Sequence, residues 1–82
     1  MAKKVTETVL KRSVKERRQL LSEKLYELRL DSDLSQAQLA EIARVDRKTI
    51  NRIENGHFSP ALDTIVRLSV ALNISPSEFL KT

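Results

Sequence analysis

Residues 34–56 read LSQAQLAEIARVDRKTINRIENG and contain the signals of two short helices separated by a tight join. Ser35 can cap the first helix, and Gln38 three residues later completes a capping box. Asp46 can cap the second helix, and Gly56 can take the left-handed conformation that ends it. Two such helices with a join of about three residues predict a helix-turn-helix unit.

The apolar residues of this unit recur at helical spacing, which predicts one buried side on each helix. The first helix is expected to end near Ala43. The expected buried side chains are Leu39, Ala40, Ile42 and Ala43 in the first helix and Ile50 and Ile53 in the second.

Further helices are expected on both sides of this unit, because the chain has only one Gly and two Pro, all in its second half. A helix over residues 20–31 carries an apolar stripe of leucines. After the unit, Ser59-Pro60 is expected to begin a fourth helix, with Ser59 as its cap, that Asn73 can end. Ser75 and the proline after it begin a fifth. The predicted fold class is all-α, with five helices.

The first 19 residues form a basic extension with seven basic and two acidic side chains, whereas the remaining residues have eight and nine. A helix that continues into residue 20 and a disordered arm are both open for this segment. We divide the chain into this extension, 1–19, and a helix-turn-helix domain, 20–82. A basic arm on a nearly neutral body is typical of a nucleic-acid binder, and a solvated charge run is the alternative.

Composition excludes several classes of protein. A chain of 82 residues with 40% hydrophobic content can bury one small core. The absence of cysteine excludes disulfides and thiolate sites, and no apolar run approaches the roughly 20 residues that span a membrane. His57 is the sole imidazole and there is no glycine-rich loop. We therefore expect no enzyme, metal, cofactor or small-molecule effector, and a cytoplasmic, nucleoid-associated protein.

A longer set of residues resembles a known family. Leu28-Arg29, the run from Leu34 to Ala40, the run Thr49-Ile50-Asn51-Arg52-Ile53-Glu54-Asn55-Gly56 and Pro60 are similar to the lambda-repressor-like (Xre, Cro-type) helix-turn-helix family. The resemblance implies five helices, a dimer, and a recognition helix that reads DNA in the major groove.

The second helix of the unit, residues 46–55, has an outward face made only of polar residues. Arginine and lysine can donate to guanine O6 and N7, and asparagine can bind adenine N6 and N7. A solvated face is the alternative, but the helix-turn-helix context projects this helix outward. The expected base contacts are Arg47, Lys48, Asn51 and Arg52.

Phosphate contacts are expected beside this helix. By resemblance, Gln36 and Asn55 contact the DNA backbone, and Arg44 is placed to do the same. The alternatives are helix-cap chemistry for Gln36 and a solvated turn residue for Arg44.

The resemblance also implies structural roles. Arg29 and Glu54 would form an ion pair that joins the first helix to the end of the recognition helix. Dimerisation would use the C-terminal end of the chain, with the N-terminal extension adding to it or replacing it. The apolar residues expected in that interface are Ile74, Phe79 and Leu80.

Two positions depart from the family pattern, because Asp33 and Arg44 stand where glycine is usual. Both positions often need a positive φ. Aspartate tolerates that conformation, whereas Arg44 would bear a penalty of about 1 kcal/mol.

The sequence therefore predicts a sequence-specific regulator, expected to be a repressor, that binds double-stranded DNA as a homodimer on a palindromic operator. The two recognition helices would lie about 34 Å apart, one turn of DNA. The alternative is an antitoxin or another helical module that binds a protein partner.

Overall fold

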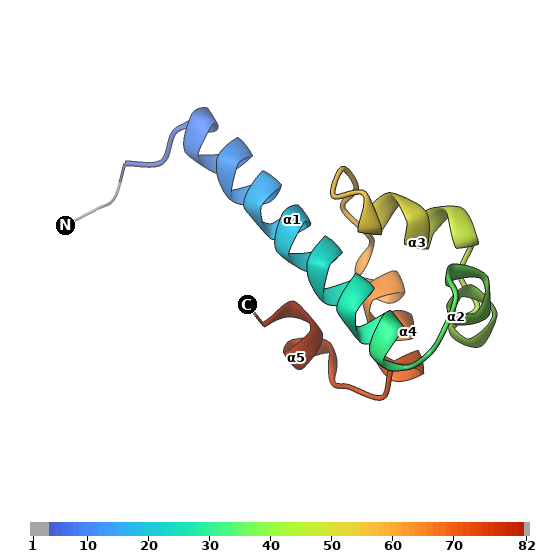
Figure 1. The fold of residues 1–82 in the computed structure, drawn as a ribbon. Coiled ribbons are helices and arrows are strands. Elements are labelled where there is room, and N and C mark those ends of the chain that lie inside the picture. Colours follow the sequence, from blue (N-terminus) through green and yellow to red (C-terminus); the bar gives the residue numbers. More distant parts are fainter. Residues whose placement is uncertain (1–3, 82) are drawn as a thin grey trace.

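The computed structural model describes residues 4–81, and within this range it contains five helices and no strand (Figure 1). The all-α, five-helix prediction is confirmed. The helices are α1 (Glu7–Asp31), α2 (Gln36–Ala43), α3 (Arg47–Glu54), α4 (Leu62–Ala71) and α5 (Pro76–Leu80).

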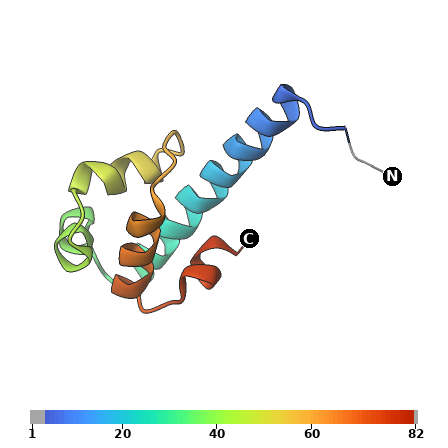
Figure 2. The same ribbon diagram turned by 180° about the vertical axis from the view of Figure 1, so that it is seen from behind.

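Helix α1 is a single helix of 25 residues that includes most of the basic extension. The hydroxyl of Thr6 caps its start by accepting a hydrogen bond from the backbone N–H of Val9 at 3.2 Å. The N-terminal half of α1 projects from the body formed by the other helices (Figures 1 and 2). Of the two alternatives for the extension, the structure thus has the helix. The division at residue 19 stays a prediction, and its first three residues lie outside the described range.

The caps predicted for α2 and α3 are confirmed. The backbone N–H of Gln38 donates to the Ser35 hydroxyl at 3.0 Å, and the Gln38 amide oxygen accepts from the Ser35 backbone N–H at 2.8 Å. The carboxylate of Asp46 accepts from the backbone N–H of Lys48 at 2.8 Å. These side chains satisfy backbone donors that each first turn would otherwise leave unpaired, and so fix where both helices begin.

The core lies between the C-terminal half of α1 and the other four helices. Its most deeply buried apolar side chains are Leu25, Leu39, Ile50, Ile53, Leu68 and Phe79. The prediction that Ile42 is buried is wrong, because its side chain is 54% exposed. Helix α2 packs on α3 and α4 through Leu39, Ala40 and Ala43, and Ile42 lies outside that narrow face.

Helix α4 begins later than predicted. Its N-cap is Ala61, which makes no side-chain capping bond, and the first helical residue is Leu62. Ser59 is therefore not the cap. Its hydroxyl instead accepts a hydrogen bond of 2.7 Å from Nε of Arg18 on α1. The long α1 thus reaches the loop before α4 and bonds to a hydroxyl that lies two residues before the N-cap.

Among residues 4–81, four adopt a positive φ, and each lies just after a helix. Gly56, at 79°, ends α3 as predicted. Asp33 and Arg44, at 56° and 57°, take the left-handed conformation that the departures from the family pattern anticipated, and Asn73, at 60°, follows α4. Glycine adopts this conformation without strain, and Asp and Asn tolerate it. Arg44 has neither advantage and stores about 1–2 kcal/mol in the turn before α3.

Replacing Arg44 with glycine tests that strain. Arg44→Gly should raise the free energy of unfolding by about 0.5–1 kcal/mol, because relief of the left-handed strain exceeds the extra chain entropy that glycine loses. Arg44→Ala is the matched control, since it removes the side chain but keeps the strain. Urea unfolding followed by circular dichroism measures both, and equal stabilities for the two variants would contradict the account.

Candidate nucleic-acid interface

Helix α3 is divided into a buried apolar side and an exposed basic side. Ile50 and Ile53 are fully buried and anchor the helix to the core. The four residues expected to contact bases are all exposed on the opposite side: Arg47, Lys48, Asn51 and Arg52. Three positive charges and one amide are therefore presented to solvent together, on a helix whose one carboxylate is turned inward.

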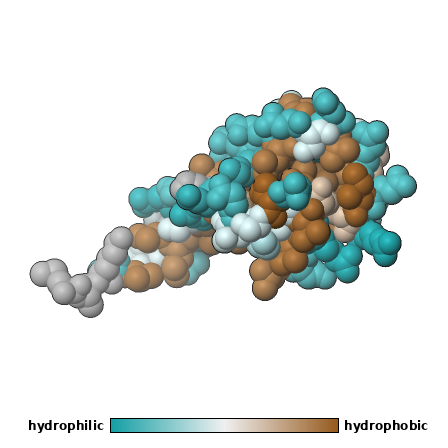
Figure 3. All heavy atoms as spheres, turned by 90° about the horizontal axis from the view of Figure 1, so that it is seen from below, coloured by the Kyte–Doolittle hydropathy of each residue, from teal (hydrophilic) through white to brown (hydrophobic). Residues whose placement is uncertain are grey.

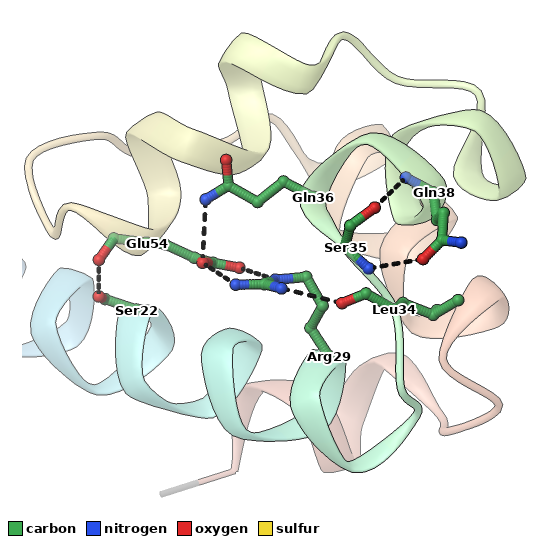
Figure 4. Close-up of polar contacts among 7 residues, drawn as sticks. All are labelled: Ser22, Arg29, Leu34, Ser35, Gln36, Gln38 and Glu54. Carbon is green, nitrogen blue, oxygen red and sulfur yellow. Dashed lines mark hydrogen bonds and ion pairs between the residues drawn. The ribbon is translucent and has the colours of Figure 1, made fainter.

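That carboxylate belongs to Glu54, and the structure brings it together with Arg29 of α1 (Figure 4). Nε and Nη2 of Arg29 donate to the two carboxylate oxygens at 2.8 and 2.9 Å. Only 10% of the arginine side chain and 7% of the glutamate side chain are exposed. This is a bidentate ion pair. It fixes the orientation of α3 relative to α1, because both hydrogen bonds must be aligned at once.

The arginine of this pair has two further contacts. Its Nη1 donates to the backbone carbonyl of Leu34 at 2.9 Å, in the turn before α2. The ring of Tyr26 lies 5.4 Å from the guanidinium carbon, within the range of a cation–π contact. The hydrogen bond to Glu54 raises the pKa of Arg29 despite the opposing effect of burial, so the pair favours the charged form of the arginine.

Gln36, expected at a phosphate, also reaches this cluster. Its amide nitrogen donates to the Glu54 carboxylate at 3.1 Å (Figure 4). The carboxylate therefore connects α1, α2 and α3. An amide nitrogen carries two hydrogens, so the contact with Glu54 leaves one hydrogen of Gln36 for another acceptor. The sequence did not reveal this internal contact, because it depends on how α2 packs beside the end of α3.

Helix α1 contacts the C-terminal end of α3 at two more points, which were not predicted from the sequence. The hydroxyl of Ser22 donates to the backbone carbonyl of Glu54 (Figure 4). A Cβ added to Gly56 would lie 3.0 Å from the side-chain oxygen of Gln19, so this residue of α1 lies directly against the turn. The available signal was the seven-residue spacing of Ser22 and Arg29, which puts two polar residues on one face of α1.

The other phosphate candidates lie at the two ends of α3. Arg44 is exposed in the turn before the helix, and its carbonyl accepts a long hydrogen bond of 3.5 Å from Arg67 of α4. Asn55 is exposed at the C-cap. Both side chains therefore flank the face that carries the base-contact candidates.

The three residues expected in a dimer interface have different surroundings. Leu80 is 47% exposed and Ile74 is partly buried against the core. Phe79 is fully buried, because α5 packs on α1 and α4 through it. The prediction that Phe79 offers apolar surface is therefore wrong, and only Ile74 and Leu80 retain area for a partner.

Residues 4–81 lack two other kinds of site. No group of three or more His, Cys, Asp or Glu side chains lies close enough to hold a metal ion. No helix in that range combines the length and the apolar character needed to cross a bilayer.

Two capped helices in tight succession, with a basic polar face on the second, define a helix-turn-helix DNA-binding protein. The sequence profile of the helix-turn-helix family HTH_3 matches residues 25–79, and the chain belongs to this family. It is a DNA-binding transcriptional regulator of the lambda-repressor-like type, as the sequence resemblance implied.

Solved structures agree with this assignment. The chain is similar to the restriction-modification controller protein C.AhdI from Aeromonas hydrophila, with 34% identity and a TM-score of 0.72 over 76% of this chain and 94% of that one. It is similar to an HTH_3 family transcriptional regulator from Vibrio cholerae, with 26% identity and a TM-score of 0.76 over 80% of this chain and 37% of that one.

A third similar structure is the clp gene regulator ClgR from Corynebacterium glutamicum, with 25% identity and a TM-score of 0.72 over 78% of this chain and 68% of that one. The chain has no match among curated proteins.

The buried pair of Arg29 and Glu54 can be tested with a double-mutant cycle. Arg29→Met or Glu54→Leu alone should lower the free energy of unfolding by about 3–5 kcal/mol, because each leaves an uncompensated buried charge. The double variant should lose clearly less than the sum of the two, since no charge is stranded. Urea unfolding of the four proteins measures the coupling, and additive losses would contradict the pairing.

Proposed function

We propose that this regulator is a sequence-specific repressor that binds double-stranded DNA as a homodimer on a palindromic operator. The observation that carries the proposal is the exposed basic face of α3, which is held to the body by the buried contacts of Glu54. A helix about 12 Å across fits the major groove, where each base pair presents a distinct pattern of donors and acceptors.

The chemistry of the α3 face suits direct readout. Arg47 and Arg52 can each donate two parallel hydrogen bonds to guanine O6 and N7, and Asn51 can exchange a pair with adenine. Lys48, near the start of the helix, can donate to a base or a phosphate. Because these side chains project from one rigid helix, a small set of adjacent base pairs would be read in a fixed register.

Phosphate contacts would set that register. We infer that Gln36, Arg44 and Asn55 donate to the backbone on the two sides of the groove. Gln36 connects the phosphate contacts to the base contacts. The Glu54 carboxylate that accepts a hydrogen bond from its amide also fixes α3 through the ion pair with Arg29. A phosphate bound by Gln36 would therefore have a fixed position relative to the recognition helix.

One recognition helix contacts few base pairs, so we infer that two are combined by dimerisation. Apolar side chains gather on the face of the body seen in Figure 3. Exposed apolar residues on α4 and α5 include Leu62, Val66, Val70 and Leu80. A two-fold dimer built there would present two α3 helices to successive turns on one side of the DNA and would block access by other proteins.

The rival class, an antitoxin or another helical module that binds a protein, rests on this same exposed apolar surface. Salt dependence separates the two functions. A DNA-binding protein loses affinity for any duplex steeply as salt rises, whereas a module that binds only protein shows little binding to DNA.

Readout by α3 is tested by comparing two single variants. Arg47→Ala should weaken binding to a preferred site by about 1–3 kcal/mol and relax the preference at one base position. Gln36→Ala should weaken binding to all duplexes to a similar degree, because it removes a phosphate contact while Arg29 still holds both oxygens of Glu54 and so keeps α3 in place. Binding profiles over a pool of duplex sequences measure both, and two variants with identical profiles would refute the assignment.

The dimer is tested at Leu80. Leu80→Asp should raise the dissociation constant of the dimer at least about tenfold, or about 1.4 kcal/mol, because it places a charge in an apolar contact. Ile42→Asp is the matched control, since Ile42 is similarly exposed but lies on α2. Sedimentation velocity at several concentrations measures the effect, and equal behaviour of the two variants would exclude this interface.

A further inference from the structure

The N-terminal half of α1 carries a second basic surface, separate from α3. Its orientation follows from the residues of α1 that touch the end of α3. Ser22 donates to the carbonyl of Glu54, and Gln19 lies against Gly56. Both residues therefore mark the side of α1 that faces α3.

Helical spacing places three basic residues on this same side. Lys15 precedes Ser22 by seven residues and Lys11 precedes it by eleven, which are close to two and three turns of about 3.6 residues. Arg12 precedes Gln19 by seven. All three side chains are exposed. We call Lys11, Arg12 and Lys15 the α1 basic face.

The apolar residues of this half of α1 lie on a different side. Leu10 and Val14 continue the stripe of Leu21 and Leu25, which turns toward the core. The basic face is thus not the side that would pack on an apolar surface. Glu7 and Glu16 border the α1 basic face, four residues from Lys11 and Arg12, where pairs can form along the helix. Residues 7–18 still hold five basic and two acidic side chains, so this part of α1 keeps a positive excess.

The projecting half of α1 is also fixed in direction. It belongs to one continuous helix, and Nε of Arg18 donates to the hydroxyl of Ser59 in the loop after α3. From Gln19 to Lys11 the helix rises about 12 Å, at about 1.5 Å per residue. The α1 basic face itself, from Lys11 to Lys15, spans about 6 Å of that length. A duplex presents one negative charge per about 3.4 Å of each strand, so this face would meet about two phosphates of one strand.

We propose that the α1 basic face binds DNA phosphates that flank the segment read by α3. The inference rests on the proposed function, because it needs a duplex seated on α3. A helix held beside the end of α3 extends the positive surface along the DNA without reading its sequence. The surface therefore adds affinity and salt dependence to every duplex, and adds no base preference.

The test compares the salt dependence of binding to a long duplex of random sequence, with the full chain throughout. K11Q/K15Q removes two charges from the α1 basic face and keeps good helix formers. The slope of log affinity against log salt should become shallower by about 2, or about 1 for each lysine. K11R/K15R keeps the charges and should keep the wild-type slope.

The matched control is K24Q/K81Q, which removes the same charge elsewhere. Lys24 and Lys81 line one depression beside Leu20, on the side of α1 away from α3. This control should leave the slope unchanged. Equal slopes for K11Q/K15Q and wild type, or an equal loss in the control, would overturn the inference and leave the proposed function standing. A wild-type protein that binds no duplex would overturn both.

Discussion

The position of the recognition helix depends on one buried carboxylate. Glu54 accepts hydrogen bonds from Arg29 of α1 and from Gln36 of α2, while Ser22 holds the backbone carbonyl of the same residue. A carboxylate this buried is tolerated only when it is paired and hydrogen-bonded, and here it is. Any shift of α1, α2 or α3 that broke these hydrogen bonds would leave a buried charge unpaired, at a cost in free energy. The three helices therefore keep one arrangement, and α3 presents its outer face in one direction.

This constraint lets a small domain present both kinds of proposed DNA contact. The apolar side of α3 is fixed by Ile50 and Ile53, so its basic side faces solvent. The turn before α3 accepts a strained Arg44, which keeps a positive charge at a position where glycine would be easier for the backbone. The long α1 passes the opposite end of α3 and continues the basic surface beyond it.

Features set by local chemistry could be predicted from the sequence, and those set by packing could not. Ser35, Asp46 and Gly56 act within one turn of themselves, so their caps and stops followed from residue type and spacing. Ser59 is not the cap, because α4 begins two residues later than the Ser-Pro signal predicts and has Ala61 at its N-cap. The hydroxyl of Ser59 instead bonds to a residue 41 positions earlier, which no local pattern could predict. Phe79 was placed at the surface because its apolar character alone does not separate a core from an interface.

Selection of bound fragments from a random duplex pool tests whether α3 reads base edges. If α3 reads base edges in a two-fold dimer, the enriched sites should contain two inverted half-sites whose centres lie about 34 Å apart, one turn of DNA. Bound fragments with the same base composition as the starting pool, at an affinity set only by salt, would contradict it.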